Sequence, residues 1–176
     1  MKWHGDIDVK LKIKSLRVGG LEPEEDVDLG TVPAEYTASS IRGLLRKAAK
    51  RVSSSLGIKG FDREIFGDVD SEGRIQIIVK YVPKSGKEKR YGIKIDPSTG
   101  SVKSGHLFSY NFLTLDELYF TIRPLLGLKE DEAKFLFYAL NYLRYETLGG
   151  FGSRGMGLIE DVEICEDFLK FVGVKK

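Results

Sequence analysis

Residues 148–165 are LGGFGSRGMGLIEDVEIC, and they connect the last predicted helix of the chain to its last predicted strand. Apolar and polar residues alternate in GLIEDVEIC, as they do in a strand with one buried face. Five glycines lie before or at the start of this strand. Because glycine has no Cβ atom, the amide groups here could come close to a phosphate, and Arg154 could add a bidentate contact.

The same glycines have a simpler explanation. A connection from a helix to a strand often needs glycine for the helix cap and for a tight turn. The segment lacks the GK[ST] ending of a Walker motif, and it follows a helix, whereas a dinucleotide-binding GxGxxG follows a strand. The sequence therefore leaves two interpretations, a phosphate-binding loop and a turn, and it disfavours a nucleotide cofactor.

Two helices are predicted upstream of this segment. The first follows Ser39 and Ser40, which are good N-caps, and it ends near Gly57. The second begins after Gly127, and three acidic residues at 130–132 favour the helix dipole in its first turn. Apolar residues spaced three and four apart give each helix a core face. These residues are Ile41, Leu44, Leu45, Ala48, Ala49 and Val52 in the first helix, and Ala133, Leu136, Phe137, Leu140 and Leu143 in the second.

The remaining strands follow from alternation or from short apolar runs bounded by turn residues. They are predicted at 7–18, 73–82, 106–113 and 117–123. The element order predicts an α+β, ferredoxin-like (RRM-like) βαββαβ domain with a glycine-rich loop near its C-terminus. We expect one domain over 1–176, with a loop insertion at 19–38 and a protruding hairpin or loop at about 83–113. RNA-recognition domains use this fold, and so do many unrelated proteins.

Composition bounds the class of protein. A chain of 176 residues that is 41% hydrophobic can bury a core without disulfides or metals. The single cysteine, Cys165, excludes an internal disulfide. We therefore expect a cytoplasmic protein that needs no cofactor to fold. The first residues, MKWHGDIDVKLKIK, contain no apolar run long enough for a signal peptide or a membrane span, so no membrane partner is expected.

Positive charge is concentrated in one stretch, although the net charge is only +2. No acidic residue lies between Glu35 and Asp62, whereas Arg42, Arg46, Lys47, Lys50, Arg51 and Lys59 do. On the first helix these side chains form a stripe away from the core face. A stripe of this kind suits an anionic partner, but a solvated helix face would look the same.

The combination of motifs resembles the RAMP superfamily of CRISPR-associated proteins. LGGFGSRGMGLIE is similar to the glycine-rich loop that precedes the last strand in that family. LRVGG at 16–20, followed by TASSIRGLLRKAAKRV at 37–52, resembles its first strand end and first helix. Three more segments resemble the backbone RAMP subunits of type III effector complexes. They are EIFGDVDSEGRIQI at 64–77, YGIKIDPSTGSVKSGHLF at 91–108 and LYFTI at 118–122.

The resemblance implies a guide-RNA-binding subunit of a CRISPR effector complex in antiviral defence. Its partners would be guide RNA, target RNA and other RAMP subunits. The implied RNA contacts lie in the first helix and the glycine-rich loop. They are Ser39, Ser40, Arg42, Arg46, Gly149, Gly150, Gly152, Ser153, Arg154, Gly155 and Gly157.

Two alternatives remain open. In the backbone RAMP subunits, an aspartate in the loop after the first strand promotes metal-dependent cleavage of target RNA, and Asp26 and Asp28 lie in that loop here. The chain would then be an endoribonuclease that uses Mg²⁺ or Mn²⁺. It could instead be a protein-interaction domain that binds no RNA, with the basic stripe merely solvated.

Overall fold

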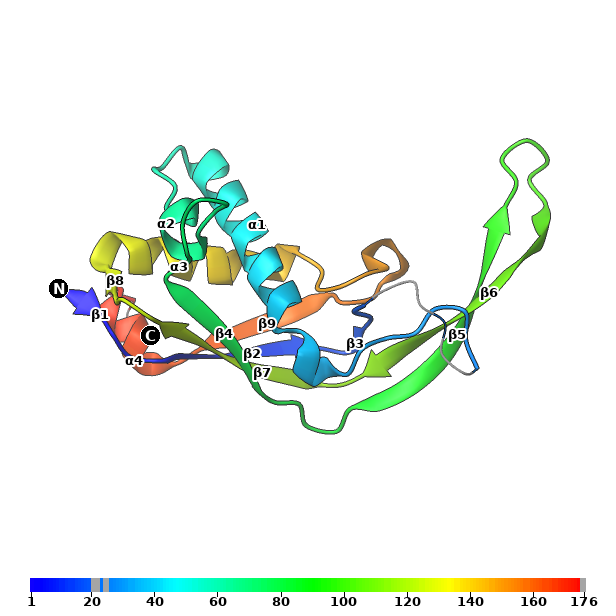
Figure 1. Ribbon diagram of the computed structural model, residues 1–176, viewed down its shortest axis with the longest axis horizontal. Coiled ribbons are helices and arrows are strands. Elements are labelled where there is room, and N and C mark those ends of the chain that lie inside the picture. The colour runs from blue at the N-terminus through cyan, green and yellow to red at the C-terminus, as the bar shows by residue number, and fades with distance from the viewer. Residues whose placement is uncertain (20–22, 24–25, 175–176) are drawn as a thin grey trace.

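The computed structural model describes residues 1–19, 23 and 26–174, so part of the predicted loop insertion lies outside the described residues. A four-stranded antiparallel sheet in the order β4-β7-β2-β9 forms the body (Figure 1). Helices α1 and α3 cover one face of this sheet. The strands are β2 (Ile7–Ile13), β4 (Ile75–Tyr81), β7 (Glu117–Pro124) and β9 (Ile159–Ile164), and the helices are α1 (Ala38–Leu56) and α3 (Glu130–Tyr142).

The topology confirms the predicted ferredoxin-like α+β fold. Along the chain the elements run β2, α1, β4, β7, α3, β9, and β2 and β7 are the two central strands. In the register, Val9 of β2 lies opposite Phe120 of β7 and Ile164 of β9. Helix α1 connects β2 to β4, and α3 connects β7 to β9, as in a split βαβ arrangement.

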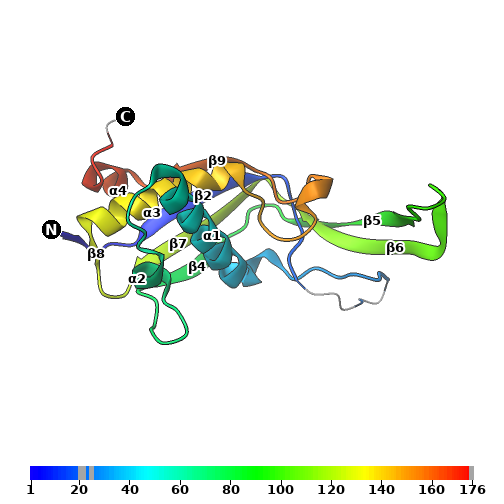
Figure 2. The same cartoon turned by 90° about the horizontal axis from the view of Figure 1, so that it is seen from above.

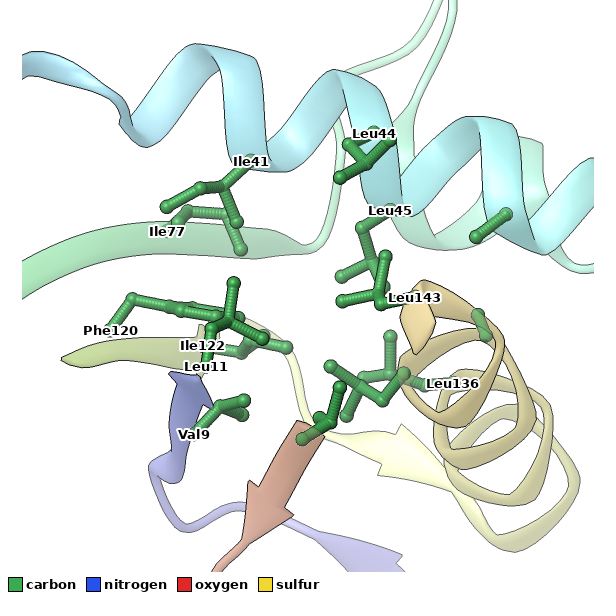
Figure 3. Packing of buried hydrophobic residues seen from close by; sticks show 14 of the residues in the cluster. Val9, Leu11, Ile41, Leu44, Leu45, Ile77, Phe120, Ile122, Leu136 and Leu143 are labelled. Atoms are coloured by element: carbon green, nitrogen blue, oxygen red, sulfur yellow. The ribbon is translucent and has the colours of Figure 1, made fainter. Parts of the chain in front are cut away.

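The core lies between the sheet and the two helices. Alternation places one face of each strand there, and the helical period places one face of each helix there. Val9 and Leu11 of β2 are buried together with Ile41 and Leu45 of α1. Figure 3 shows these side chains pointing into one common space between the helices and the sheet. Removing them from water is the main source of stability of such a core.

A second sheet leaves the body as a long hairpin. Strand β5 (Gly86–Ile95) pairs with β6 (Val102–Thr114), and β6 also pairs with the short strand β3 (Ser15–Leu16). Figures 1 and 2 show the hairpin extending away from the helices along the long axis of the molecule. The predicted strand at 106–113 is the inner part of β6.

Several local predictions were wrong. Ser39 and Ser40 lie inside the first turn of α1, because the helix begins at Ala38, and the Thr37 hydroxyl donates to the Ala34 carbonyl instead. The predicted strand at 7–18 is divided into β2 and β3. The sequence also missed short elements that carry too few residues for a period to show. They are β1 (Lys2–Trp3), β8 (Leu128–Lys129), α2 (Asp62–Phe66), α4 (Glu166–Phe171) and the 3-10 helices Ala34–Tyr36, Leu143–Tyr145 and Gly152–Arg154.

The two chain ends meet at the edge of the body away from the hairpin. Trp3 packs against Phe168 and Phe171, with ring centroids 5.5 and 5.4 Å apart. Strand β1 pairs with β8 beside them. No helix within the described part of the chain is long and apolar enough to cross a membrane.

Candidate nucleic-acid interface

The glycine-rich segment, residues 148–158, lies against residues 15–17, which are strand β3 and the residue after it. The Gly150 amide donates to the Arg17 carbonyl over 2.7 Å, and the Gly157 amide donates to the Ser15 carbonyl over 2.8 Å. The Leu148 amide closes the segment by donating to the Gly157 carbonyl over 2.8 Å. Figures 1 and 2 place the segment beside the base of the hairpin. These hydrogen bonds hold it in one conformation.

Close packing accounts for most of its glycines. A Cβ atom on Gly149 would lie 2.2 Å from the Arg17 carbonyl oxygen, and one on Gly157 would lie 1.9 Å from that of Leu148. A Cβ atom on Gly152 would lie 2.5 Å from the Thr147 hydroxyl oxygen. Gly155 differs, because its φ is +79° and nothing lies within 4 Å of its Cβ position. The turn interpretation therefore explains three of the five glycines.

The amide groups of the segment are largely used within the protein. Besides Gly150 and Gly157, the Gly155 amide donates to the Gly152 carbonyl over 2.9 Å, and the Arg154 amide donates to the Phe151 carbonyl over 2.9 Å. In this conformation these four amides do not form a cradle for a phosphate, which was one of the two interpretations of the sequence. The segment instead presents side chains, and Ser153 and Arg154 are both exposed.

Arg154 lies over aromatic rings. Its guanidinium carbon is 4.6 Å from the ring centroid of Phe151, 5.3 Å from that of Phe108 and 5.9 Å from that of Tyr110. At such distances a cation is attracted by the negative face of an aromatic ring. The arginine thus joins the glycine-rich segment to strand β6 of the hairpin.

Sequence reasoning missed these rings. Phe108, Tyr110 and Phe112 alternate with Ser109 and Asn111 along β6, so a strand places all three rings on one face. Tyr110, Phe112 and Met156 form a small buried cluster, and Phe108, Phe151 and Leu29 pack against it. The alternation FSYNF was the signal that could have identified this face.

Arg17 supports the same cluster from below the surface. Its side chain is 4% exposed, lies 4.7 Å from the Phe151 ring centroid and donates to the Gly30 carbonyl over 3.1 Å. Burial lowers the pKa of this guanidinium, although an arginine stays charged at neutral pH. The Arg17 guanidinium therefore contacts both the loop that contains Gly30 and the glycine-rich segment that contains Phe151.

The hairpin carries most of the nearby positive charge. Between residues 84 and 114 the chain has six Lys and Arg residues against two acids, Glu88 and Asp96. Asp96 is occupied by the turn at the hairpin tip, where it accepts hydrogen bonds from the Ser98 amide and hydroxyl. Five of the basic residues are in the strands and exposed: Lys87, Lys89, Arg90, Lys94 and Lys103.

The structure gives the predicted arginines of α1 other partners. Arg42 donates to the Phe66 carbonyl over 2.6 Å. Together with Arg46 it lines a hollow of about 670 Å³ whose other wall is residues 66–73. Both Nε atoms are buried, and neither has a hydrogen-bond partner among the described residues. These two side chains therefore lie with α2 and the loop that follows it, whereas Arg154 lies with β6.

Further along α1, a buried carboxylate pairs with two of the five basic side chains of this helix. Glu146 is 5% exposed and accepts from Lys47 over 3.0 Å and from Arg51 over 2.5 Å. The basic stripe is therefore partly an internal ion-pair group, and its positive charge is smaller than the sequence suggested. Ser39 at the start of the helix is exposed, and Ser40 is half-buried.

The two aspartates of the predicted metal site have different surroundings. The Asp28 carboxylate accepts hydrogen bonds from the Ser109 amide over 2.6 Å and from the Ser109 hydroxyl over 2.9 Å. The hydrogen bond from the amide is the main cause of the lowered pKa of Asp28. Asp26 is exposed, and its carbonyl accepts from Lys89. Among the described residues, no group of three or more His, Cys, Asp or Glu side chains is placed to hold a metal ion.

The open face of the four-stranded sheet carries ion pairs. Lys10 lies 2.7 Å from Glu163 and 3.6 Å from Glu117, on the two neighbouring strands. The Tyr119 hydroxyl donates to Glu117 over 2.7 Å. RNA-recognition domains stack bases on aromatic residues of this face. Here a phosphate chain would meet carboxylates, so the hairpin end is the better candidate for an anionic ligand.

Comparisons with known proteins agree with this fold. The sequence matches the RAMP superfamily over residues 18–160. No curated protein matches the chain. Its structure is similar to a chain in the "Cryo-EM structure of the Type III-B Cmr-beta bound to cognate target RNA", with a TM-score of 0.56 and 16% sequence identity. The match covers 90% of this chain and 60% of that chain, so this chain spans less than two thirds of its structural neighbour. The chain belongs to the RAMP superfamily.

Proposed function

We propose that this chain is a guide-RNA-binding subunit of a CRISPR type III effector complex that acts in antiviral defence. Membership of the RAMP superfamily and the likeness to a chain of a Cmr complex bound to target RNA support this role. The neighbouring subunits of such a complex would be other RAMP proteins. Residues 1–176 act as one domain in this proposal, because the main hydrophobic cluster takes residues from Ile7 to Val172.

One observation carries the proposal. Exposed cations of the hairpin and the Arg154 side chain gather with aromatic rings at one end of the molecule. Phosphates require cations, and unpaired bases stack on aromatic or guanidinium planes, so this combination suits single-stranded RNA better than an acidic protein. The predicted contacts in the glycine-rich loop fall into this region. Arg42 and Arg46 stay secondary candidates because their guanidinium groups face residues 66–73.

The geometry supports binding more than cleavage. Ser109 already donates two hydrogen bonds to Oδ2 of the Asp28 carboxylate, and a divalent ion at that oxygen would have to compete with them. A metal-dependent reaction at Asp26 stays a prediction that magnesium- or manganese-dependent cutting of target RNA by the assembled complex would test. The variant Asp26→Asn should then stop the cutting and leave guide binding intact.

The test of binding is its dependence on salt. We expect the purified chain to bind single-stranded RNA with an affinity that falls steeply as salt rises, because each neutralised phosphate releases counterions. The double variant Lys94→Gln/Lys103→Gln removes two exposed hairpin cations. It should flatten the slope of log K against log salt by roughly 1.4, since each phosphate contact on a single strand contributes about 0.7.

A matched control removes the same charge elsewhere. Lys134 and Lys170 lie on α3 and α4, towards the end of the molecule that is opposite the hairpin (Figure 1). The variant Lys134→Gln/Lys170→Gln should leave the slope unchanged. Absence of RNA binding at low salt, or equal flattening by both double variants, would contradict the proposal.

A further inference from the structure

Arg154 and Arg90 are the two exposed arginines in the described part of the chain that lie over aromatic rings without an acidic partner; the Arg90 guanidinium carbon is 4.6 Å from the ring centroid of Phe112 alone, whereas Arg154 meets three rings. No carboxylate forms an ion pair with Arg154 in the described part of the chain. Its fixed neighbours are the rings of Phe108, Tyr110 and Phe151. Arg123 and Arg144, which are also exposed, are each anchored by a carboxylate. The rings therefore do for Arg154 what an acidic partner does for the others.

The rings themselves are fixed by the hairpin. Phe108 lies opposite Gly92 in the register of β5 and β6. A Cβ atom on Gly92 would lie 2.4 Å from Cζ of Phe108 and 2.8 Å from both of its Cε atoms. The Phe108 ring therefore lies flat across the glycine, in space that any side chain would fill. Tyr110 is 4% exposed and meets Phe151 edge to face, at 4.8 Å and 82°.

A held guanidinium offers two kinds of surface. Its N–H groups lie around the edge of a plane and can donate to phosphate oxygens, whereas its flat face can stack on another planar group. An ordinary exposed arginine loses much rotamer freedom when it adopts a single geometry, and a pre-held one loses less. The rings contact one side of the Arg154 guanidinium and the side chain is exposed, so part of the group is open to a ligand before any ligand arrives.

We propose that Arg154, supported by Phe108, Tyr110 and Phe151, is a stacking surface for an unpaired RNA base. This inference rests on the proposed RNA-binding function. It specifies that the site binds the base of a nucleotide and not its phosphate. A base within a duplex is covered on both faces by its neighbours, so the ligand is a single-stranded or unstacked nucleotide. Stacking on a guanidinium is tolerant of base identity, because every base has a flat face.

The test separates a plane from a charge. Arg154→Lys keeps the positive charge and removes the plane. Two short single-stranded oligonucleotides of equal length serve as probes, one with bases and one with abasic riboses throughout. We expect the substitution to weaken binding of the base-containing RNA by roughly 5- to 150-fold, the range that a lost base stack produces. Binding of the abasic RNA, which can meet only the charge, should change little.

The outcomes are distinct. Equal weakening of both RNAs by Arg154→Lys would make Arg154 a phosphate contact and overturn the proposal, and so would no change with either RNA. If the parent protein binds neither RNA, the proposed function fails together with this inference. Arg63→Lys, at an exposed arginine on α2, is the matched control and should leave both affinities unchanged. Thermal unfolding of each variant distinguishes loss of the hairpin contact from loss of stacking. An Arg154→Lys protein that melts like the parent and still loses only the base-containing RNA supports stacking.

Discussion

Gly157→Ala should destabilise this protein far more than Gly155→Ala, although the two glycines lie two residues apart and both have a left-handed backbone. Their φ angles are +70° and +79°. Nothing lies within 4 Å of a Cβ atom at Gly155, whereas the Leu148 carbonyl oxygen lies 1.9 Å from a Cβ atom at Gly157. Gly155→Ala therefore tests backbone strain alone, and Gly157→Ala adds a clash with the main chain.

The structure allows the two effects to be sized. An alanine in the left-handed region costs about 1–2 kcal/mol, and the less flexible unfolded chain offsets roughly 0.4–1 kcal/mol of that. Gly155→Ala should therefore cost about 1 kcal/mol. At Gly157 the Leu148 carbonyl must move, which breaks the hydrogen bonds from the Leu148 amide and from the Gly157 amide to Ser15. Each of the two amides left unpaired costs about 1–3 kcal/mol, so with the backbone strain Gly157→Ala should cost about 3–7 kcal/mol in all.

Equilibrium urea denaturation followed by far-UV circular dichroism measures both variants against the parent. A loss of about 3–7 kcal/mol is a large part of the roughly 5–15 kcal/mol that holds a typical domain together, so Gly157→Ala should unfold at much lower urea. Equal midpoints for the two variants would refute the reasoning that Gly157 is required by close packing. A refolded Gly157→Ala protein with parental RNA affinity would show that the exact path of the segment does not matter for binding.

Two other predictions concern residues assigned from the sequence. Arg42→Ala should lower the free energy of unfolding by roughly 1.5–3 kcal/mol, because its half-buried guanidinium donates to the Phe66 carbonyl over 2.6 Å, and an unchanged melting temperature would contradict this. The Asp28 carboxyl has a folded pKa lowered from 3.8, mainly by the Ser109 amide, so its stabilising effect is present above that value and is lost as the pH falls through the lowered pKa. Asp28→Asn should therefore make the stability of the protein less sensitive to acid, and identical acid unfolding curves for the variant and the parent would show that the Ser109 contact does not stabilise the fold.

The sequence predicted the elements whose signal is local. The spacing of Ile41, Leu44 and Leu45 fixes the buried face of α1, because a helix repeats every 3.6 residues wherever it packs. Alternation located β2 and β9 in the same way. Short elements such as α2 were missed because five residues complete little more than one turn, and packing decides their structure instead.

Partners far apart in the sequence could not be predicted from local patterns. Arg42 reaches a carbonyl 24 residues away, and Lys47 and Arg51 reach a carboxylate 99 and 95 residues away. A basic stripe on a helix carries no information about which of its members the fold will neutralise. The sequence placed the glycine-rich segment between the second helix and the last strand, but it could not show that the amides of Gly150 and Gly157 would donate to the carbonyls of Arg17 and Ser15.

Charge compensation elsewhere favours the hairpin end as the proposed RNA-binding surface. Cross-strand ion pairs occupy the open face of the sheet, and Glu146 pairs with Lys47 and Arg51 of α1, so carboxylates compensate part of the positive charge on both surfaces. The glycines at 149, 152 and 157 let the segment before β9 pack tightly against its neighbours, and that packing carries Arg154 onto the rings of β6. In the proposed site, the glycines would therefore act on RNA only indirectly. They set the position of Arg154, and Arg154 with its rings is the contact that we propose.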